Sequence, residues 1–274
     1  MDDLGVELLH RGAHGVAATE AGKALFARIK TIEAELRHAR NDVETIQGAG
    51  VGEIRVSASP SVATGLLPRA VIAFQRKHPR VSFHLLEGVY PDMLPAIRTG
   101  DLDLAICLVP GKPRDDSLSF ISLVRDRLVP AVRADHPVLK RRNVKLADLT
   151  NLDWIIYRRS HTGLDVFEQT FLANRLEPPK STIECTSFAC ALALVENGNY
   201  VTLVPSQIFA GRGTPSLAPV LLDAPMQPWQ VLAISRAKHE LSAVCLAFLA
   251  ELQKTAAKID LPMSNARRPA RPRA

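Results

Sequence analysis

The stretch TEAGKALFARIKTIEAELRHARNDVETIQGAGVGEIRVSAS, residues 19–59, contains two patterns that meet at a run of glycines. Its first part carries apolar residues separated alternately by four and three positions, at Leu25, Ile29, Ile32, Leu36, Ala39, Val43 and Ile46. Gly48, Gly50 and Gly52 follow, and residues 53–59 then alternate between polar and apolar side chains. The stretch therefore predicts one long helix, a break, and the first strand of a separate domain.

The long helix is predicted to be a dimerisation helix over residues 19–48. An average spacing of 3.5 residues favours the narrow apolar seam of a two-stranded coiled coil. Thr19 is the expected N-cap, and Glu20 lies favourably against the helix dipole. A helix that packs only on its own domain is the alternative. We expect a homodimer, possibly a tetramer, with the seven apolar residues above forming its seam.

Downstream of the glycines, predicted strands and helices alternate. Strands are expected at 53–59, 81–85 and 102–109, and helices between them at 61–77 and 93–97. A β-α-β-α-β order favours parallel strands that are joined by right-handed crossovers. This part of the chain is therefore predicted to form an α/β lobe.

A break at residues 110–113, Pro-Gly-Lys-Pro, precedes a second set of elements. Strands are predicted there at 118–124, 128–133, 154–157, 182–185, 201–204 and 220–222, and helices at 164–173 and 188–196. A last strand, 230–235, and a last helix, 239–257, follow a loop that is rich in proline and glycine. The expected fold class is thus α/β with a second, smaller lobe.

Composition and charge favour a globular protein that is not secreted. Hydrophobic residues make up 47% of the 274 residues and charged residues 23%, which is ordinary for a globular domain. The sequence has no apolar run near the ~20 residues of a spanning helix and no secretory start, so we expect a cytoplasmic location and no membrane partner. The net charge is +6, but four arginines lie in the tail after Pro262 and the first fifty residues hold six basic and eight acidic residues. This distribution argues against an intact DNA-binding module, which is usually basic.

Enzyme and metal chemistry find little support in the sequence. Ser160, His161 and Asp165 are the residue types of a catalytic triad, but neighbours in sequence do not supply its geometry. No G-x-S-x-G elbow is present, and the glycines at 48–52 precede a strand, whereas a dinucleotide-binding loop follows one. The four cysteines form no C-x-x-C pair. We therefore expect no enzyme activity, no cofactor and no metal site.

A series of short motifs resembles the LysR-type transcriptional regulators. They occur in the family's order: Ala18-Thr19-Glu20-Ala21-Gly22, Gly52-Glu53-Ile54-Arg55-Val56, Leu67-Pro68, His78-Pro79, Gly100-Asp101-Leu102-Asp103-Leu104-Ala105-Ile106, Asp135-His136-Pro137, and Gly198 to Pro205. The resemblance implies a winged helix-turn-helix headpiece, a linker helix and a two-lobed effector domain like a periplasmic binding protein. It implies that the chain crosses between the lobes twice, so that residues 53–109 and 226–258 form lobe I and 113–222 form lobe II. Residues 259–274 are expected to be a basic, disordered tail.

The resemblance begins only at the end of the headpiece. Residues 1–18 then correspond to the end of the recognition helix and the wing, which leaves His10, Arg11 and His14 as candidate DNA contacts. A start codon placed too late and a genuine truncation are both open. Promoter DNA is an expected partner if the full headpiece is present. The alternative is a truncated dimer partner, or a small-molecule-binding module, that does not contact DNA.

The resemblance also implies a small-molecule inducer, usually an organic acid, between the lobes. Ser59 and Ser61 lie where a strand leads into a helix, a place that favours an anion, although simple N-capping is an alternative role for either residue. Other candidates follow strand ends, where open α/β folds bind ligands. These are Gly88, Val89, Ser160, His161, Thr162, Thr186 and Ser187.

Overall fold

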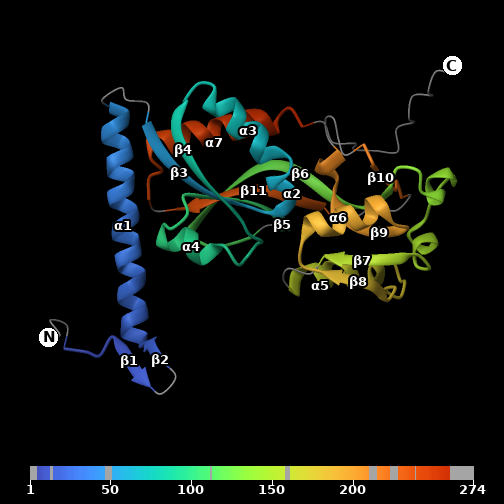
Figure 1. Cartoon of the computed structure of the whole chain (residues 1–274), viewed down its shortest axis with the longest axis horizontal. Helices are drawn as coiled ribbons and strands as arrows, with labels where there is room; N and C mark the ends of the chain where they lie inside the picture. The colour runs from blue at the N-terminus through green and yellow to red at the C-terminus, as the bar shows by residue number, and fades with distance from the viewer. Residues whose placement is uncertain are drawn as a thin grey trace.

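The computed structural model of the chain consists of a β-hairpin, a long helix and a two-lobed α/β body (Figure 1). It describes residues 5–12, 15–46, 51–111, 113–157, 161–209, 215–222, 228–237 and 239–259. Within these ranges it leaves undescribed the side chains of Arg11, Pro228 and residues 44–46 and 161–166. The α/β body with two lobes confirms the predicted fold class.

The hairpin and the helix are joined by a well-defined cap. Strands β1 (Leu9–Gly12) and β2 (Gly15–Ala18) pair antiparallel and lead into α1 (Glu20–Ile46). The Thr19 hydroxyl oxygen accepts a hydrogen bond from the Gly22 N–H at 3.0 Å, which confirms the predicted N-cap. The hairpin lies at the end of α1 that projects away from the two lobes (Figure 1).

One mixed sheet runs through both lobes. Its strands, in spatial order, are β4 (Arg80–Glu87), β3 (Val51–Ala58), β5 (Leu104–Pro110), β11 (Pro228–Arg236), β6 (Leu118–Arg133), β9 (Tyr200–Pro205), β7 (Asp153–Tyr157) and β8 (Ser181–Cys185), and β10 (Leu217–Pro219) pairs with β6. β3 is parallel to both β4 and β5, as the β-α-β-α-β pattern predicts. β4, β3, β5 and β11 belong to lobe I, and β9, β7, β8 and β10 belong to lobe II. β6 extends into both lobes.

Helices cover both faces of the sheet in each lobe. In lobe I these are α2 (Pro60–Ala63), α3 (Leu66–Gln75), α4 (Leu94–Thr99) and α7 (Ala243–Ala256). In lobe II they are α5 (His161–Leu172) and α6 (Phe188–Asn197), with the short 3₁₀ helices η1 (Pro137–Lys140), η2 (Leu146–Leu149) and η3 (Ser206–Phe209). Figure 1 shows α3 and α7 on one side of the lobe I sheet and α4 on the other.

Aromatic clusters mark the two cores. In lobe I, Phe74 of α3 packs edge-on against Phe248 of α7, and Phe83 of β4 contacts both rings. In lobe II, the fully buried Trp154 packs against Phe167 and Phe171 of α5. Each lobe therefore has an apolar core of its own, and the sheet connects the two lobes.

One long strand, β6, makes that connection. β6 pairs with β11 from Leu118 to Arg127 and then with β9 from Leu128 to Ala131, so it belongs to both lobes. The sequence predicted two strands here, 118–124 and 128–133, with the charged residues 125–127 between them. The strand instead continues through them, since the Asp126 carboxylate is buried and accepts hydrogen bonds from the start of η3.

Two predicted helices differ in extent from the structure. The helix expected at 61–77 is divided into α2 and α3 at Gly65, which adopts a non-helical conformation and precedes the first residue of α3. The helix expected at 239–257 begins only at Ala243. Its first N–H group donates to the Asp42 carboxylate of α1 at 3.2 Å, so a residue from another element caps the helix.

The two faces of α1 have different surroundings. The predicted seam is uncovered in the single chain: Ile32 and Leu36 are 59% and 60% exposed, Ile29, Ala39 and Val43 are exposed, and Leu25 is half-buried. The Ile46 side chain lies outside the described residues. The opposite face packs against β3, α4 and α7 and buries Ala34, His38 and Asn41. The helix therefore docks on lobe I through small and polar residues while its apolar stripe remains unpaired.

Candidate functional site

A cavity of about 140 Å³ lies between the two lobes at the carboxyl ends of the parallel strands. Lobe I contributes residues that follow β3 and β4, the end of β5 and the start of β11; lobe II contributes β7, β9 and one residue each from β6, α5 and α6. The lining is Ser59, Pro60, Ser61, Val89, Tyr90, Leu108, Pro110, Leu128, Ile155, Ile156, Tyr157, Phe167, Phe188, Thr202, Leu203, Pro205 and Trp229. Any occupant would contact both lobes at once.

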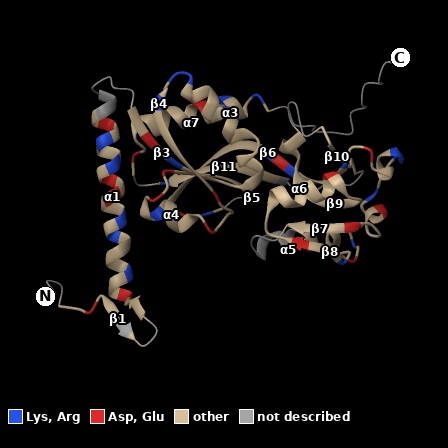
Figure 2. Ribbon diagram, in the orientation of Figure 1, with Lys and Arg blue, Asp and Glu red and all other residues tan. Residues whose placement is uncertain are grey.

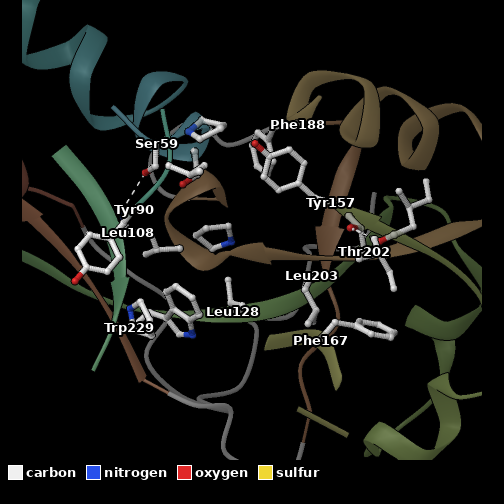
Figure 3. A pocket seen from close by; sticks show the side chains of 17 residues that line it. Ser59, Tyr90, Leu108, Leu128, Tyr157, Phe167, Phe188, Thr202, Leu203 and Trp229 are labelled. Atoms are coloured by element: carbon white, nitrogen blue, oxygen red, sulfur yellow. Dashed lines mark hydrogen bonds between the residues drawn. The ribbon is translucent and has the colours of Figure 1, made fainter. Parts of the chain in front are cut away.

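The lining is mainly apolar and aromatic (Figure 3). Trp229 and Tyr90 approach from lobe I, and Tyr157 and Phe188 stack edge to face on the lobe II side with ring centroids 5.7 Å apart. None of the described side chains that line the cavity carries a charge. Such a site favours a small molecule with an apolar body, held in orientation by a few polar groups.

The polar groups on the lobe I side come from the turn between β3 and α2. The Ser59 hydroxyl accepts a hydrogen bond from the Leu108 N–H at 3.1 Å, and the Ser59 N–H donates to the Ile106 carbonyl at 3.0 Å. Ser59 thus ties the end of β3 to β5 and does not cap α2 with its side chain. Because its oxygen is the acceptor in that bond, the hydroxyl proton remains available for an occupant of the cavity.

Ser61 is the second hydroxyl at this turn. It lies within the first turn of α2, is 4% exposed, and lines the cavity. Its hydroxyl has no hydrogen-bond partner among the residues that the structure describes. Neither serine therefore has the N-capping role that was the alternative, and both side chains are placed to contact a ligand.

The other predicted positions are divided between the cavity and its surroundings. Val89 lines the cavity with the two serines. Gly88 is adjacent, and a Cβ atom there would lie 2.9 Å from the Ser57 hydroxyl. Thr186 and Ser187 are exposed and are not among the described lining residues; Ser187 caps α6 by accepting from the Cys190 N–H at 3.2 Å. Ser160 and the side chains of His161 and Thr162 lie outside the described residues.

A protein-family model matches the part of the chain that forms the two lobes. The family model described as the LysR substrate binding domain matches residues 47–257, which include both lobes and every strand that lines the cavity. The chain belongs to the LysR family. This confirms the resemblance that the sequence motifs indicated.

Relatives across this LysR region are transcriptional regulators. The chain is 27% identical over 209 residues to the transcriptional dual regulator GltC of Bacillus subtilis, covering 76% of this chain and 69% of GltC. It is 23% identical over 234 residues to the regulator GbpR of Azospirillum brasilense, covering 84% of this chain and 68% of GbpR. The family thus comprises regulators and not enzymes.

Solved structures of the LysR family share the fold. The BenM effector binding domain with its effector benzoate is 26% identical, with a TM-score of 0.60 over 75% of this chain and 92% of that one. Full-length OxyR from Pseudomonas aeruginosa has a TM-score of 0.68 at 18% identity, over 98% of this chain and 86% of that one. CbnR has a TM-score of 0.63 at 20% identity, over 87% of this chain and 82% of that one. The last two likenesses concern the fold alone.

Most of the cavity in this LysR chain was not predicted from its sequence. Trp229, Phe188 and Phe167 read as core residues of separate strands and helices, and Thr202 reads as an interior strand position. The signal that could have found some of them is their place at the ends of strands that face the crossing between the lobes. The sequence pattern does not show which strand ends meet.

Two of the three candidate DNA contacts, His10 and Arg11, lie on β1 of the hairpin. His10 is exposed on β1, Arg11 lies in β1 with its side chain outside the description, and His14 lies outside the described residues. Figure 2 shows that both basic and acidic residues occur along α1. The described part of the chain contains no helix that is both long and apolar enough to span a membrane, and no cluster of residues suited to bind a metal ion.

Asp126 lies at the crossing, opposite Trp229 in the register between β6 and β11. Burial raises the pKa of its carboxyl group, and the hydrogen bonds that it accepts from Ser206, Arg127 and Gln207 offset only part of that effect. The raised pKa means that the ionised form is disfavoured in the folded state. Asp126 therefore contributes stability at low pH that is lost as the pH rises above the unfolded-state pKa, ~3.9.

Replacing Asp126 by asparagine is expected to raise the melting temperature at pH 7 by a few degrees. The amide oxygen can keep the bonds that the Ser206 hydroxyl and N–H donate to Oδ1, at 2.6 and 3.0 Å, without the charge. Thermal melts at pH 4 and pH 7 would test this, since the difference between variant and wild type should shrink at pH 4. The raised pKa of Asp126 would be contradicted if Asp126→Asn had a lower melting temperature than wild type at pH 7 and did better against wild type at pH 4.

Proposed function

We propose that this chain is a LysR-type regulator that binds a small, ring-bearing organic acid between its lobes and changes transcription in response. The observation that carries the proposal is the cavity, whose lining comes from both lobes. A ligand that contacts two bodies favours the arrangement in which both contacts are made, and so shifts the population of lobe arrangements.

The chemistry of the lining supports a ring with one polar end. Most of the residues that line the cavity are aromatic or aliphatic, whereas Ser59 and Ser61 bring two hydroxyl groups from the same turn, between β3 and α2. A carboxylate in an apolar site is costly unless it is hydrogen-bonded, and hydroxyls at the start of α2 can supply those bonds. Related effector domains bind such molecules: benzoate is the effector of BenM, and QuiR was solved with shikimate.

Dimerisation and DNA contact complete the proposal. The exposed stripe on α1 would pair with a second copy, because a row of large apolar side chains gains free energy when it leaves water. The hairpin at the far end of α1 would lie on DNA, with His10 and Arg11 close to the phosphates. A regulator that acts on promoter DNA would be located in the cytoplasm.

A thermal-shift panel tests the ligand class. It should contain benzoate, shikimate and related cyclic acids, each beside a neutral amide or alcohol of the same ring. At a hundredfold excess over its dissociation constant a ligand stabilises the native state by ~2.7 kcal/mol, which corresponds to roughly 5–10 °C for a chain of this size. We expect at least one acid to reach this shift and its neutral counterpart to fall well short of it.

Isothermal titration of the best acid then measures stoichiometry and affinity. One site per chain is expected. A panel in which neutral compounds stabilise the protein as well as their acids would contradict the organic acid as ligand class. No stabilisation by any cyclic compound would contradict the ligand-binding role of the cavity.

A further inference from the structure

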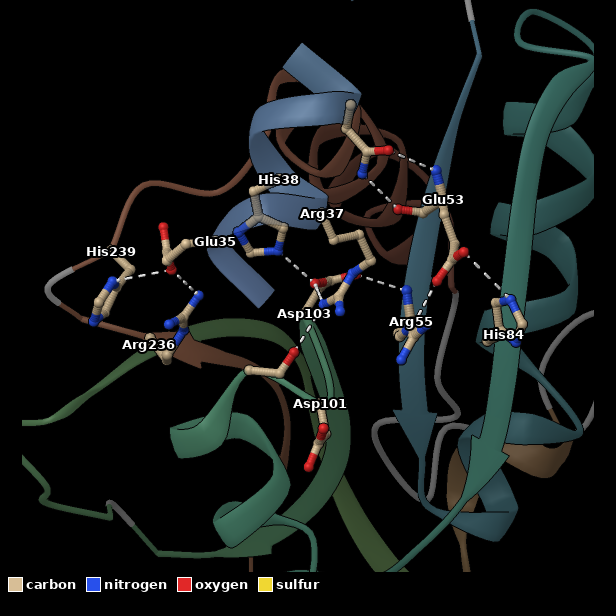
Figure 4. A network of polar contacts seen from close by, with 12 residues as sticks. Glu35, Arg37, His38, Glu53, Arg55, His84, Asp101, Asp103, Arg236 and His239 are labelled. Atoms are coloured by element: carbon tan, nitrogen blue, oxygen red, sulfur yellow. Dashed lines mark hydrogen bonds and ion pairs between the residues drawn. The ribbon is translucent and has the colours of Figure 1, made fainter. Parts of the chain in front are cut away.

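The contact between α1 and lobe I is built around one buried carboxylate, that of Asp103, whose side chain is 0% exposed (Figure 4). From α1, Arg37 donates to Asp103 Oδ1 at 2.9 Å, and His38 Nε2 lies 2.7 Å from the same oxygen. From lobe I, the Arg55 N–H donates to Oδ2 at 2.7 Å. Arg37 also donates to the Gly100 carbonyl at 2.8 Å.

These contacts keep Asp103 ionised. Burial by itself would raise the pKa of the carboxyl group, but the hydrogen bonds from His38 and Arg55 and the charge of Arg37 outweigh burial and hold the pKa below its ordinary value. An ionised Asp103 is an acceptor only, so His38 donates to it from Nε2. The carboxylate is thus the acceptor for two donors from the helix.

α1 also supplies hydrogen bonds that a neighbouring strand would normally supply. β3 pairs with β5 only from Val56 to Ala58, so the earlier part of β3 has no strand partner on that side among the described residues. The Asn41 side chain fills the place, because its Oδ1 accepts from the Glu53 N–H at 3.2 Å and its Nδ2 donates to the Glu53 carbonyl at 3.0 Å. Release of α1 would expose these backbone groups to water.

The same contact holds several buried polar atoms that have no partner. Among the described residues, Arg37 Nε, His38 Nδ1 and Arg236 Nη1 are buried and unpaired, and all three belong to α1 or to the lobe I surface around it. Unpaired buried groups cost free energy that hydration would recover. The docked state therefore combines strong, specific hydrogen bonds with the free-energy cost of unpaired polar atoms. This combination suits a contact between α1 and lobe I that can open.

The contact and the cavity lie at opposite ends of the same strands. Asp103 directly precedes β5, whose far end places Leu108 in the cavity. Arg55 lies on β3, which leads to Ser59, and Arg236 ends β11, which begins beside Trp229. At about 3.3 Å per residue these strands span roughly 13 to 23 Å. Three strands thus connect the helix-docking surface to the cavity directly.

We propose that Arg37 and His38 of α1 and Asp103 of lobe I form a reversible latch that sets the position of the dimerisation helix relative to the lobes. Its regulatory meaning rests on the proposed function, but the latch itself does not. Opening it frees α1 from β3 and leaves the lobe I core intact. The exposed stripe on the other face of α1 is unaffected.

Hydrogen exchange of the full chain without ligand tests the latch, with the Glu53 amide as the reporter. Asp103→Asn removes the charge and places an amide N–H₂ against the donors on one of its two sides, either Arg37 and His38 or the Arg55 N–H. Ala34→Leu changes no polar group, but the Ala34 methyl lies so close to Gly100 that a Cβ atom there would overlap it. We expect exchange at Glu53 to be at least about tenfold faster in both variants, with protection of β11 unchanged.

Two matched controls accompany these variants. Asp101→Asn removes a charge two residues away, from an exposed contact with Lys30 at 3.5 Å, and Ala24→Leu enlarges an exposed alanine of α1. Both should exchange like wild type at Glu53. Wild-type protection of Glu53 in either latch variant would overturn the proposal. So would loss of protection throughout lobe I, because Asp103 would then be part of the lobe's own core. As no ligand is used, these outcomes are independent of what the cavity binds.

Discussion

A chain with Leu36→Asp is expected to be a monomer at concentrations where the wild type is a dimer. Leu36 is 60% exposed in the single chain and lies in the middle of the apolar stripe of α1. In a two-fold interface the substitution occurs twice, so two buried leucines are lost and two carboxylates enter an apolar seam. Burial of each leucine contributes about 1.5–3 kcal/mol, which corresponds to a dissociation constant roughly 100- to 10,000-fold larger.

Light scattering coupled to size exclusion would measure this directly. The wild type should elute with twice the chain mass of 29.9 kDa and the variant with the single mass. Ala24→Asp is the control, since this exposed position lies on the same helix but away from the stripe. An unchanged mass for Leu36→Asp would reject the α1 seam as the dimer interface, whichever other surface holds the subunits together.

Ser61→Phe is expected to abolish ligand binding without unfolding the protein. The Ser61 side chain lines the cavity, and a phenyl ring would occupy much of its about 140 Å³. Because the Ser61 hydroxyl has no hydrogen-bond partner among the described residues, the substitution breaks no bond of the fold. Overpacking costs ~1–3 kcal/mol, which a domain of ordinary stability tolerates. We expect ligand affinity to fall by about 100-fold or more.

Ser61→Ala distinguishes the effect of a filled cavity on ligand affinity from the effect of a lost hydrogen bond. It keeps the cavity open and removes only the hydroxyl, so affinity should fall by about tenfold or less, the worth of one hydrogen bond. Titration of the ligand found in the thermal-shift panel compares both variants with wild type. If Ser61→Phe still binds that ligand with wild-type affinity, the binding site is not the cavity between the lobes.

The sequence predicted the elements of the fold better than their contacts. Heptad spacing located α1, and alternation located the strands of lobe I, because both patterns depend on residues that are near in sequence. The motif order then indicated the family and the double crossing. The continuity of β6 was missed, since a buried Asp126 with partners on η3 cannot be told from an exposed loop aspartate without the fold.

The docking face of α1 was missed for a related reason. Ala34, His38 and Asn41 are small or polar, so an analysis of apolar periodicity assigns them to the solvent side. Their partners, Gly100, Asp103 and Glu53, come from lobe I. At the cavity the same limit applies: Ser59, Ser61 and Val89 follow strand ends and were predicted, whereas Trp229 and Phe188 come from segments much further along the chain.

The pairing of β6 with β11 has a mechanical consequence for the protein. β6, which continues from one lobe into the other, is hydrogen-bonded to β11 from Pro228 to Arg236, with an irregularity in register between Val231 and Leu232. A two-stranded ribbon of this kind bends and twists more easily than it stretches or shears. We therefore expect the lobes to move relative to each other mainly by bending and twisting of this ribbon, so that different occupants of the cavity would produce the same kind of lobe rotation.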